Sequence, residues 1–399
     1  MNPLPIAWTL LKANRLTSLL FLFLFLVLIA IAVALGVAIT AQERALRDGS
    51  ARAAQPFDLI VAAPGSRMEV MFNVVYLRAS AVEMLPNEIV TQLMGERGVE
   101  FAAPLAFGDN AGGYPIVGTI TDLVTHLGGV AEGASFTERA HAVAGADTPF
   151  AVGDSIVSAH GDGSSDQGDH GEMAVVGRLA PTGTVWDRAV LVPIEFMWEA
   201  HSLATGHADP DAPIGPPYDP AFIGGVPALV VKPADLPTAY GLRQSYRTER
   251  STAFFPAEVL AEIYGYLGDV RSIMNLLTIA TQVLVVAAIL AGIVALMQLY
   301  RTRLAVLRAL GATRSFVFLV MWVYVMALIL GGAVLGLAGG WGVAGAISSV
   351  FAAETGMNLR ATLGGEEFAL VGTLLGLGAL LAALPAWALF RKPPVAFLR

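Results

Sequence analysis

The sequence predicts a membrane protein with four transmembrane α-helices and a large α+β extracytoplasmic domain inserted between helices 1 and 2. Three observations predict this fold class. The chain is 55% hydrophobic and only 14% charged, which is too apolar for a soluble protein of 399 residues. Four apolar runs are each long enough to cross a hydrocarbon core of about 30 Å, which takes about 20 helical residues. The charged residues also divide by sign between the segments that join these runs.

The four predicted spans are residues 16–40, 274–300, 315–347 and 368–390. The first run contains no ionisable residue and is longer than the 7 to 15 apolar residues of a cleavable signal peptide, so we expect a retained anchor. Four spans place both termini on the same side of the membrane.

Charge segregation predicts the orientation. Segments 1–15, 301–314 and 391–399 carry nine Lys and Arg residues and no carboxylate, whereas all 32 acidic residues and all six histidines fall on the other side. Cytoplasmic loops accumulate Lys and Arg, so we expect a cytoplasmic N-terminal segment, loop and tail. The outer segments then hold 15 basic and 32 acidic residues, and the nine basic residues inside bring the whole chain to its net charge of −8. No nucleic acid partner is expected, because phosphate binding needs a basic footprint.

Residues 41–255 are predicted to form the α+β domain, and 348–367 a second outer loop. Short β-branched or alternating runs between Gly and Pro indicate strands, and a helical period indicates helices. The chain has no cysteine, so the domain needs a core that holds without disulfides. We expect strands at 57–62, 115–120, 174–179, 189–193 and 226–232, helices at 87–97 and 236–247, and exposed loops at 159–172 and 206–220.

The helical pattern resumes at residue 257 and continues through the second span to about residue 300. It predicts that a stalk helix, residues 256–273, projects from the membrane. The alternative is a separate short helix broken near Gly265 or Gly268. Glycine weakens a helix by only about 1 kcal/mol, so Gly265 and Gly268 do not decide between a continuous helix and a broken one.

Residues 301–314 form the sharpest motif. Apolar residues recur at helical spacing, arginines occupy the remaining face, and a glycine follows where a helix would end. The pattern predicts a short amphipathic helix that docks a cytoplasmic partner. The alternative is a basic flank that only orients the spans. The residues assigned to docking are Arg301, Arg303, Leu304, Leu307, Arg308, Leu310 and Gly311.

This motif, Leu-Ala-Val-Leu-Arg-Ala-Leu-Gly-Ala-Thr between arginines, resembles the signature of the FtsX-like permease family, which includes MacB-type and LolC-type transporter subunits. Three other stretches agree in order: Leu-Lys-Ala-Asn-Arg-Leu-Thr at 11–17, the glycine-rich third span, and Pro-Val-Ala-Phe-Leu-Arg at 394–399. Residues 57–66, 117–119 and 176–184 resemble the periplasmic core domain of the same permeases.

The resemblance implies a permease subunit of an ABC transporter in the bacterial inner membrane, with its large domain in the periplasm. It implies a partner ATPase that carries ATP and Mg²⁺ and binds residues 301–314, and a second permease copy or paralogue. ATP-driven closure would move the periplasmic domain, a process called mechanotransmission, to export or release a cargo, with a periplasmic binding or adaptor protein as a further partner. The chain itself has no G-x-x-x-x-G-K-[ST] loop, so we expect no enzymatic activity and no cofactor of its own.

Two further sets of residues are candidates for sites. His160, Asp162, His170 and His201 suit zinc or another divalent metal, although their spacing matches no defined metal motif and a solvated loop is the alternative. Gly332 and Gly336 have the spacing that lets helices approach closely, within one subunit or across a dimer.

No catalytic motif is present: the chain has no G-x-S-x-G elbow, no H-E-x-x-H helix and no cysteine nucleophile. The alternative function is therefore not an enzyme. It is a membrane-anchored periplasmic scaffold that binds or senses a metal or another ligand without transport activity.

Overall fold

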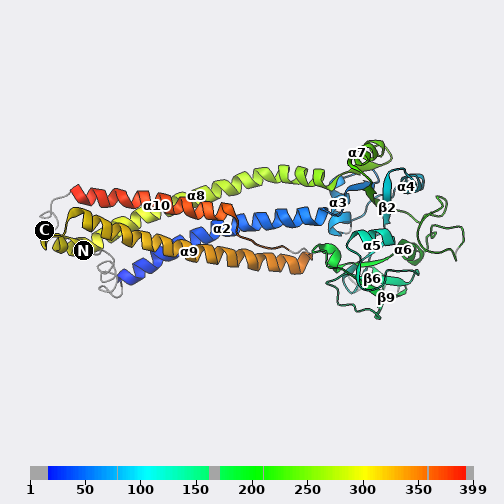
Figure 1. Cartoon of the computed structure of the whole chain (residues 1–399), viewed down its shortest axis with the longest axis horizontal. Helices are drawn as coiled ribbons and strands as arrows, with labels where there is room; N and C mark the ends of the chain where they lie inside the picture. Colours follow the sequence, from blue (N-terminus) through cyan, green and yellow to red (C-terminus); the bar gives the residue numbers. More distant parts are fainter. Residues whose placement is uncertain (1–16, 79, 161–170, 210, 357–358, 392–399) are drawn as a thin grey trace. The chain divides into compact units, whose positions relative to one another are not determined.

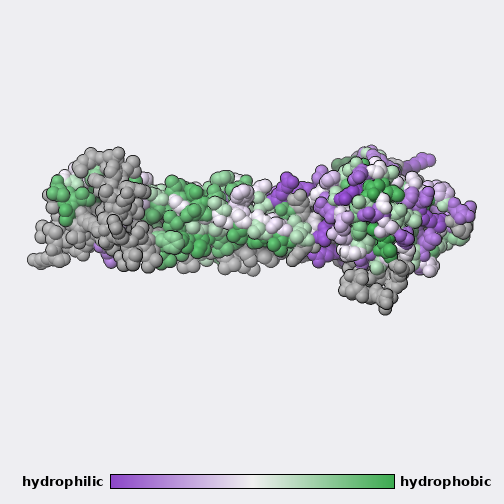
Figure 2. Space-filling view, turned by 90° about the horizontal axis from the view of Figure 1, so that it is seen from below, coloured by the Kyte–Doolittle hydropathy of each residue, from purple (hydrophilic) through white to green (hydrophobic). Residues whose placement is uncertain are grey.

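The computed structural model describes residues 17–78, 80–160, 171–209, 211–356 and 359–391. The chain divides into two compact units. The helical unit consists of Met1–Leu46, Leu267–Val350 and Leu359–Arg399, and the α+β unit consists of Arg47–Tyr266 and Phe351–Asn358. Figure 2 shows hydrophobic residues over the helical unit and most of the strongly hydrophilic residues on the α+β unit.

Four long helices supply the helical unit: α2 (Thr17–Ala54), α8 (Pro256–Ala309), α9 (Arg314–Thr355) and α10 (Gly365–Arg391) (Figure 1). Within the described residues, Phe23–Ala54 of α2 and Arg314–Ala353 of α9 are long and apolar enough to cross a membrane. The spans expected at 274–300 and 368–390 fall within α8 and α10. Membrane crossing by those two helices stays a prediction.

The continuous helix expected over 257–300 is confirmed and is longer than predicted. Helix α8 has no break at Gly265 or Gly268 and runs through residues 301–309. The predicted docking segment is therefore formed by the last turns of α8 and the turn that follows, and is not a separate helix. The boundary between the two units falls inside α2, α8 and α9.

Helices α2 and α9 pack through small residues. Ile29, Val33 and Val37 recur every four residues on one face of α2 and are almost fully buried. A Cβ on Gly332 would lie 2.8 Å from Ile29 Cβ, and a Cβ on Gly336 would lie 2.5 Å from Val33 Cβ. The two glycines selected from the sequence thus bring the backbones of two helices of the same chain together, as the first of their two interpretations predicts.

One sheet of the α+β unit joins the two ends of the inserted domain. Its four strands are antiparallel and lie in the order β12-β1-β11-β2. Strand β1 follows α2 and strand β12 precedes α8, so the chain enters and leaves the domain through neighbouring strands. The runs Leu-Ile-Val-Ala in β1 and Ala-Leu-Val-Val in β11 are buried, as expected of central strands. The bounds are β1 (Leu59–Ala62), β2 (Val99–Leu105), β11 (Ala228–Pro233) and β12 (Thr252–Phe254).

The second sheet is mixed and has the order β5-β9-β6-β10-β4-β3-β8, with β7 paired to β9. The pairs β4–β10 and β6–β9 are parallel. Its strands are β3 (Asp109–Ala111), β4 (Tyr114–Thr119), β5 (Val130–Gly133), β6 (His141–Ala144), β7 (Ser155–Val157), β8 (Ala159–His160), β9 (Glu172–Leu179) and β10 (Val190–Pro193). The helices of the unit are α3 (Arg67–Tyr76), α4 (Asn87–Met94), α5 (Thr121–His126), α6 (Ile194–Ala200), α7 (Leu236–Ser245) and the 3-10 helix η1 (Val185–Arg188).

All five expected strands and both expected helices are present, and their ends agree with the prediction within three residues. The loop expected at 206–220 is irregular, but it is not simply solvated. Glu195, which is 1% exposed, accepts hydrogen bonds from Gly215 N at 2.5 Å and from Tyr218 Oη at 2.9 Å. A buried carboxylate outside the loop therefore holds it against the domain.

Candidate functional site

Helix α8 ends in a defined turn at the segment selected from the sequence. Gly311 has φ +95°, a conformation that favours glycine. Its amide donates to Arg308 O at 3.1 Å, and the Ala312 amide donates to Leu307 O at 3.0 Å. These two bonds are those of a Schellman motif. The expectation that Gly311 ends the helix is confirmed.

The apolar residues of this end of α8 point in different directions. Leu307 is half-buried and packs with Ala312 and Phe316 against the core of the helical unit. Leu310 is 80% exposed and Val306 is 49% exposed. The structure thus assigns Leu307 to packing within the chain and leaves Val306 and Leu310 as the accessible apolar pair. The side chains of Arg301, Arg303 and Leu304 lie outside the described part of the segment.

The next helix begins directly after the turn. The Thr313 hydroxyl accepts a hydrogen bond from the Phe316 amide at 3.3 Å, which caps the start of α9. Arg314, the first residue of α9, is exposed. A positive charge at a helix N-terminus is unfavourable by a few tenths of a kcal/mol to about 1 kcal/mol. The helix dipole therefore does not account for a basic residue at position 314.

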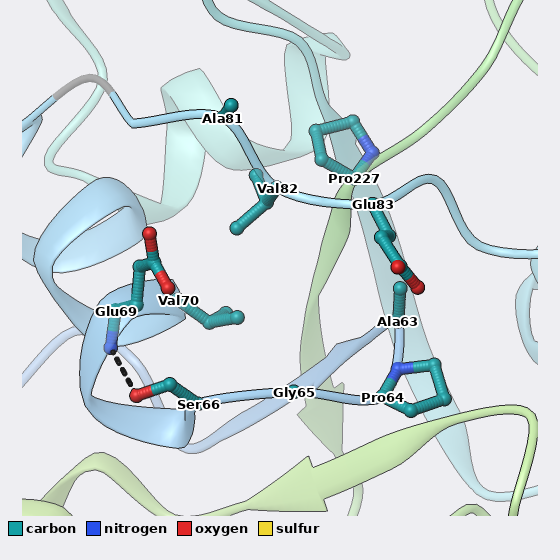
Figure 3. Close-up of a pocket in the computed structure, with 10 residues that line it drawn as sticks. All are labelled: Ala63, Pro64, Gly65, Ser66, Glu69, Val70, Ala81, Val82, Glu83 and Pro227. Carbon is teal, nitrogen blue, oxygen red and sulfur yellow. Dashed lines mark hydrogen bonds between the residues drawn. The ribbon is translucent and has the colours of Figure 1, made fainter.

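The α+β unit has a pocket of about 200 Å³ beside the start of α3 (Figure 3). Val70 and Val82 point into it, and Glu69 and Glu83 lie on opposite sides. Ser66 caps α3 by accepting a hydrogen bond from the Glu69 amide at 3.3 Å. The wall is mostly backbone and small residues, and the two carboxylates are exposed. Local helix capping accounts for the polar contacts that line this pocket.

The predicted metal residues are only partly brought together. His201 lies at the end of α6, with its Nε2 atom 3.5 Å from Asp109 Oδ1. His160 belongs to β8 and is the register partner of Asp109 in β3. Asp162 and His170 lie outside the described residues. In the part of the chain that the structure describes, no group of three or more His, Cys, Asp or Glu side chains gathers as a metal site would.

The segment 182–188 carries two charged residues that make tertiary contacts. Asp187 is buried and accepts hydrogen bonds from the amides of Thr182 and Gly183, both at 2.7 Å. Arg188 donates to Ala353 O at 2.6 Å, near the C-terminus of α9, and its guanidinium lies over the ring of Tyr114. A cation at a helix C-terminus interacts favourably with the helix dipole. No local pattern predicts Arg188, because its partner is 165 residues away.

Within the α+β unit, side-chain contacts join the ends of α2 and α8, and α3 to α2. The Arg47 guanidinium of α2 lies 5.6 Å from the ring centroid of Tyr264 in α8, and Tyr264 Oη donates to Arg47 O at 3.3 Å. Tyr76 of α3 donates to Ser50 O of α2 at 3.3 Å, and burial raises the pKa of Tyr76 to about 12. The ends of α2 and α8 that lie in this unit are therefore joined by side-chain contacts.

Comparison with known families finds a match for the C-terminal part of the chain. Residues 275–394 match the model of the FtsX-like permease C-terminal domain, a range that includes the turn at Gly311, all of α9 and all of α10. A search of curated proteins gave no match. FtsX-like permeases are inner-membrane proteins that are not themselves catalytic and generally work with a cytoplasmic ABC ATPase. The C-terminal part of the chain is therefore similar to the C-terminal domain of the FtsX-like permeases, and the chain is a membrane protein.

Proposed function

We propose that this chain is the permease subunit of a MacB-like or LolC-like ABC transporter, which couples ATP hydrolysis by a separate cytoplasmic ATPase to motion of its periplasmic α+β unit. The motion would drive export or release of a periplasmic or membrane cargo. The observation that carries the proposal is the family match over 275–394, which includes the capped end of α8.

The proposed docking surface consists of Val306, Leu310 and the neighbouring Arg308 and Arg314. An accessible apolar pair flanked by arginines suits a partner groove with an apolar floor and acidic rim. The Schellman turn holds Leu310 in one place, and Leu307 connects the same turn to the core of the helical unit. A force applied at Leu310 would therefore act on both α8 and α9.

The route to the outer unit is the helices themselves. Helices α2, α8 and α9 each continue from the helical unit into the α+β unit. Inside the α+β unit, Tyr264 connects α8 to α2 and Arg188 binds the end of α9. This connectivity favours mechanotransmission over the alternative of a scaffold that only senses a ligand, because a scaffold would need only one anchoring helix.

The test is co-purification of an ABC ATPase with the full chain and measurement of its stimulated hydrolysis. Leu310→Asp should weaken ATPase association at least tenfold, because it places a charge in the apolar contact. Leu236→Asp is the matched control, since Leu236 is 70% exposed on α7 of the other unit and should leave association unchanged. Unchanged association and stimulation in Leu310→Asp would overturn the docking assignment. Leu307→Asp is unsuitable because Leu307 also packs within the chain.

A further inference from the structure

We propose that a groove of about 530 Å³ beside helix α3 binds a small aromatic carboxylate. The groove lies within the α+β unit, and the proposal does not depend on the transport function proposed above. Its volume is within the range of about 300–1,000 Å³ that is typical of small-molecule sites, which combine a mostly apolar wall with a few polar groups. The described residues that line it are Ser66, Met68, Glu69, Phe72, Arg78 and Ser80.

Helix α3 supplies the apolar wall of the groove. Met68 and Phe72 are four residues apart, a spacing that places both side chains on the same face of the helix. Phe72 is 41% exposed, whereas the adjacent Met71 and Asn73 are buried. A second aromatic ring pairs favourably both with an exposed phenyl ring and with a thioether sulfur. The wall therefore favours an aromatic ligand.

Arg78 supplies the positive charge of the groove. Its side chain is exposed, and in the described part of the chain its guanidinium has no carboxylate partner within ion-pair distance. A guanidinium binds a carboxylate through two parallel hydrogen bonds. Arg78 can therefore bind the anionic group of a ligand without first giving up an ion pair of its own.

The backbone at Arg78 is fixed in an uncommon conformation. Leu77 has φ +50°, in the left-handed region that glycine usually occupies at the end of a helix. The Leu77 side chain packs against the core, and the Arg78 amide donates a hydrogen bond to Phe72 O at 2.9 Å. Strained backbone persists only where the surrounding contacts determine it, and such positions cluster at functional sites. The turn therefore presents Arg78 from one defined position.

Two serine hydroxyls add hydrogen-bond donors to the lining. The buried Asn73 accepts a hydrogen bond from the Ser80 amide at Oδ1, at 2.8 Å, and donates from Nδ2 to Ser80 Oγ at 2.9 Å. Ser66 Oγ accepts a hydrogen bond from the Glu69 amide at 3.3 Å. Because each hydroxyl oxygen accepts a bond from the protein, each keeps its own proton to donate. Both hydroxyls can therefore donate to an anion.

Glu69 restricts the ligand to one negative charge. It is the acidic residue of the described lining and balances Arg78, so a second carboxylate on the ligand would meet no further basic group. Glu69 also lines the neighbouring pocket of about 200 Å³, where Figure 3 shows it with Val70 on the opposite side from Glu83. We therefore expect the carboxylate of the ligand at Arg78, away from this acidic pair, and the aromatic ring against Met68 and Phe72.

The experiment measures binding of 4-fluorophenylacetate to the full chain in lipid nanodiscs by ¹⁹F NMR line broadening. We expect the chain to broaden the signal, excess unlabelled phenylacetate to reverse the broadening, and empty nanodiscs to cause none that phenylacetate reverses. Arg78→Gln should weaken binding at least fivefold. Arg97→Gln is the matched control, because Arg97 is also exposed in the α+β unit but does not line the groove, and it should bind as the unmodified chain does.

Two further comparisons separate the charge from the ring. 4-Fluorophenylacetamide has the same ring without the charge and should bind at least fivefold more weakly than the acid. Phe72→Leu keeps an apolar side chain but removes the ring, and should weaken binding of the acid at least threefold. Absence of reversible broadening with the unmodified chain, or equal binding by Arg78→Gln, by Phe72→Leu or of the amide, would overturn the proposal.

Discussion

Single buried polar residues attach the irregular segments of the α+β unit to its core. Glu195 holds the loop 206–220 through Gly215 and Tyr218, and Asp187 closes the turn at Thr182 and Gly183. Arg178 donates to Ala146 O at 2.6 Å and to Phe150 O at 3.2 Å, which fixes the loop after β6. In a domain without disulfides, such contacts restrict loops that no strand pairing holds.

The clearest residue-scale test is Glu195→Ala. It removes the acceptor of two hydrogen bonds in a buried place, which costs about 1–3 kcal/mol for each donor left unsatisfied. Glu195→Gln keeps one acceptor oxygen and should lose less. Glu199→Ala is the control, because Glu199 is 60% exposed and forms only a surface ion pair with Arg139. Urea unfolding followed by Trp fluorescence measures the three variants, and equal stability of Glu195→Ala and Glu199→Ala would contradict the assigned role.

Asp235 makes a second residue-scale prediction, which concerns pH. It caps α7 by accepting a hydrogen bond from the Thr238 amide at 2.8 Å, and hydrogen bonds from the Thr238 side chain and backbone lower its pKa from 3.8. A lowered pKa in the folded state means that the cap contributes fully above 3.8 and is lost as pH falls below that value. The protection of the Thr238 amide, which is the intrinsic exchange rate at the same pH divided by the observed rate, should therefore fall on acidification. Asp235→Asn retains a cap without a titrating group, so its exchange should lack this acid-dependent change.

At the scale of elements, helix ends and helix contacts depend on a few glycines. Gly311 ends α8 because it adopts φ +95°, and the same turn positions Leu310. Gly332, Gly336 and Gly340 let α9 approach α2 closely enough that an added Cβ would contact backbone or side-chain atoms of α2. Other glycines of α9, such as Gly342 and Gly345, have no such neighbour. Which face of the helix a glycine occupies therefore matters more for packing than how many glycines the helix contains.

Substitution of Gly336 tests this packing. Gly336→Ala places a Cβ 2.5 Å from Val33 Cβ and 2.6 Å from Ala30 O, and should destabilise the helical unit by about 1–3 kcal/mol. Gly345→Ala is the matched control on the same helix, and it should be neutral or stabilising by up to about 1 kcal/mol, since alanine is the better helix former. Thermal unfolding of the full chain in detergent compares them. A Gly336→Ala variant as stable as Gly345→Ala would show that the α2–α9 contact does not limit stability.

On the scale of the whole molecule, three helices contribute to both units. The unit boundary falls within α2, α8 and α9, and the α+β unit includes the ends of all three. Arg188 and Tyr264 attach the ends of α9 and α8 inside that unit. If motion is transmitted as proposed, the continuity of these helices carries it.

Insertion of four residues between Tyr266 and Leu267 of α8 tests this continuity. Four glycines should interrupt transmission, because each costs about 1 kcal/mol relative to alanine in a helix. Four alanines keep the segment helical and serve as the control. We expect ATPase association to survive in both variants, whereas ATP-dependent change in protease sensitivity of the α+β unit should be lost only with glycine. A glycine variant that responds to ATP like the unmodified chain would contradict transmission through α8.

Local patterns in the sequence were sufficient to predict several of the helices and strands. Buried β-branched runs predicted β1, β10 and β11, and the glycine after an amphipathic segment predicted the end of α8. Short strands such as β3 and β7, each of three residues, were missed because so few residues carry no readable period. Strand β2 was missed although it has seven residues, since its burial changes along its length.

The sequence by itself determined the membrane class, the order of the long helices and the inserted α+β unit, and the motif at 301–314 that resembles the FtsX-like permeases, because apolar length, charge sign and residue spacing are properties of neighbouring residues. Only the tertiary structure decided that Leu307 packs inward while Leu310 is exposed, that Arg188 caps α9, and that His201 faces Asp109. These contacts join residues that are distant in the chain, or depend on which side of a helix meets its neighbour. No local pattern carries that information, because it is set by how the elements pack.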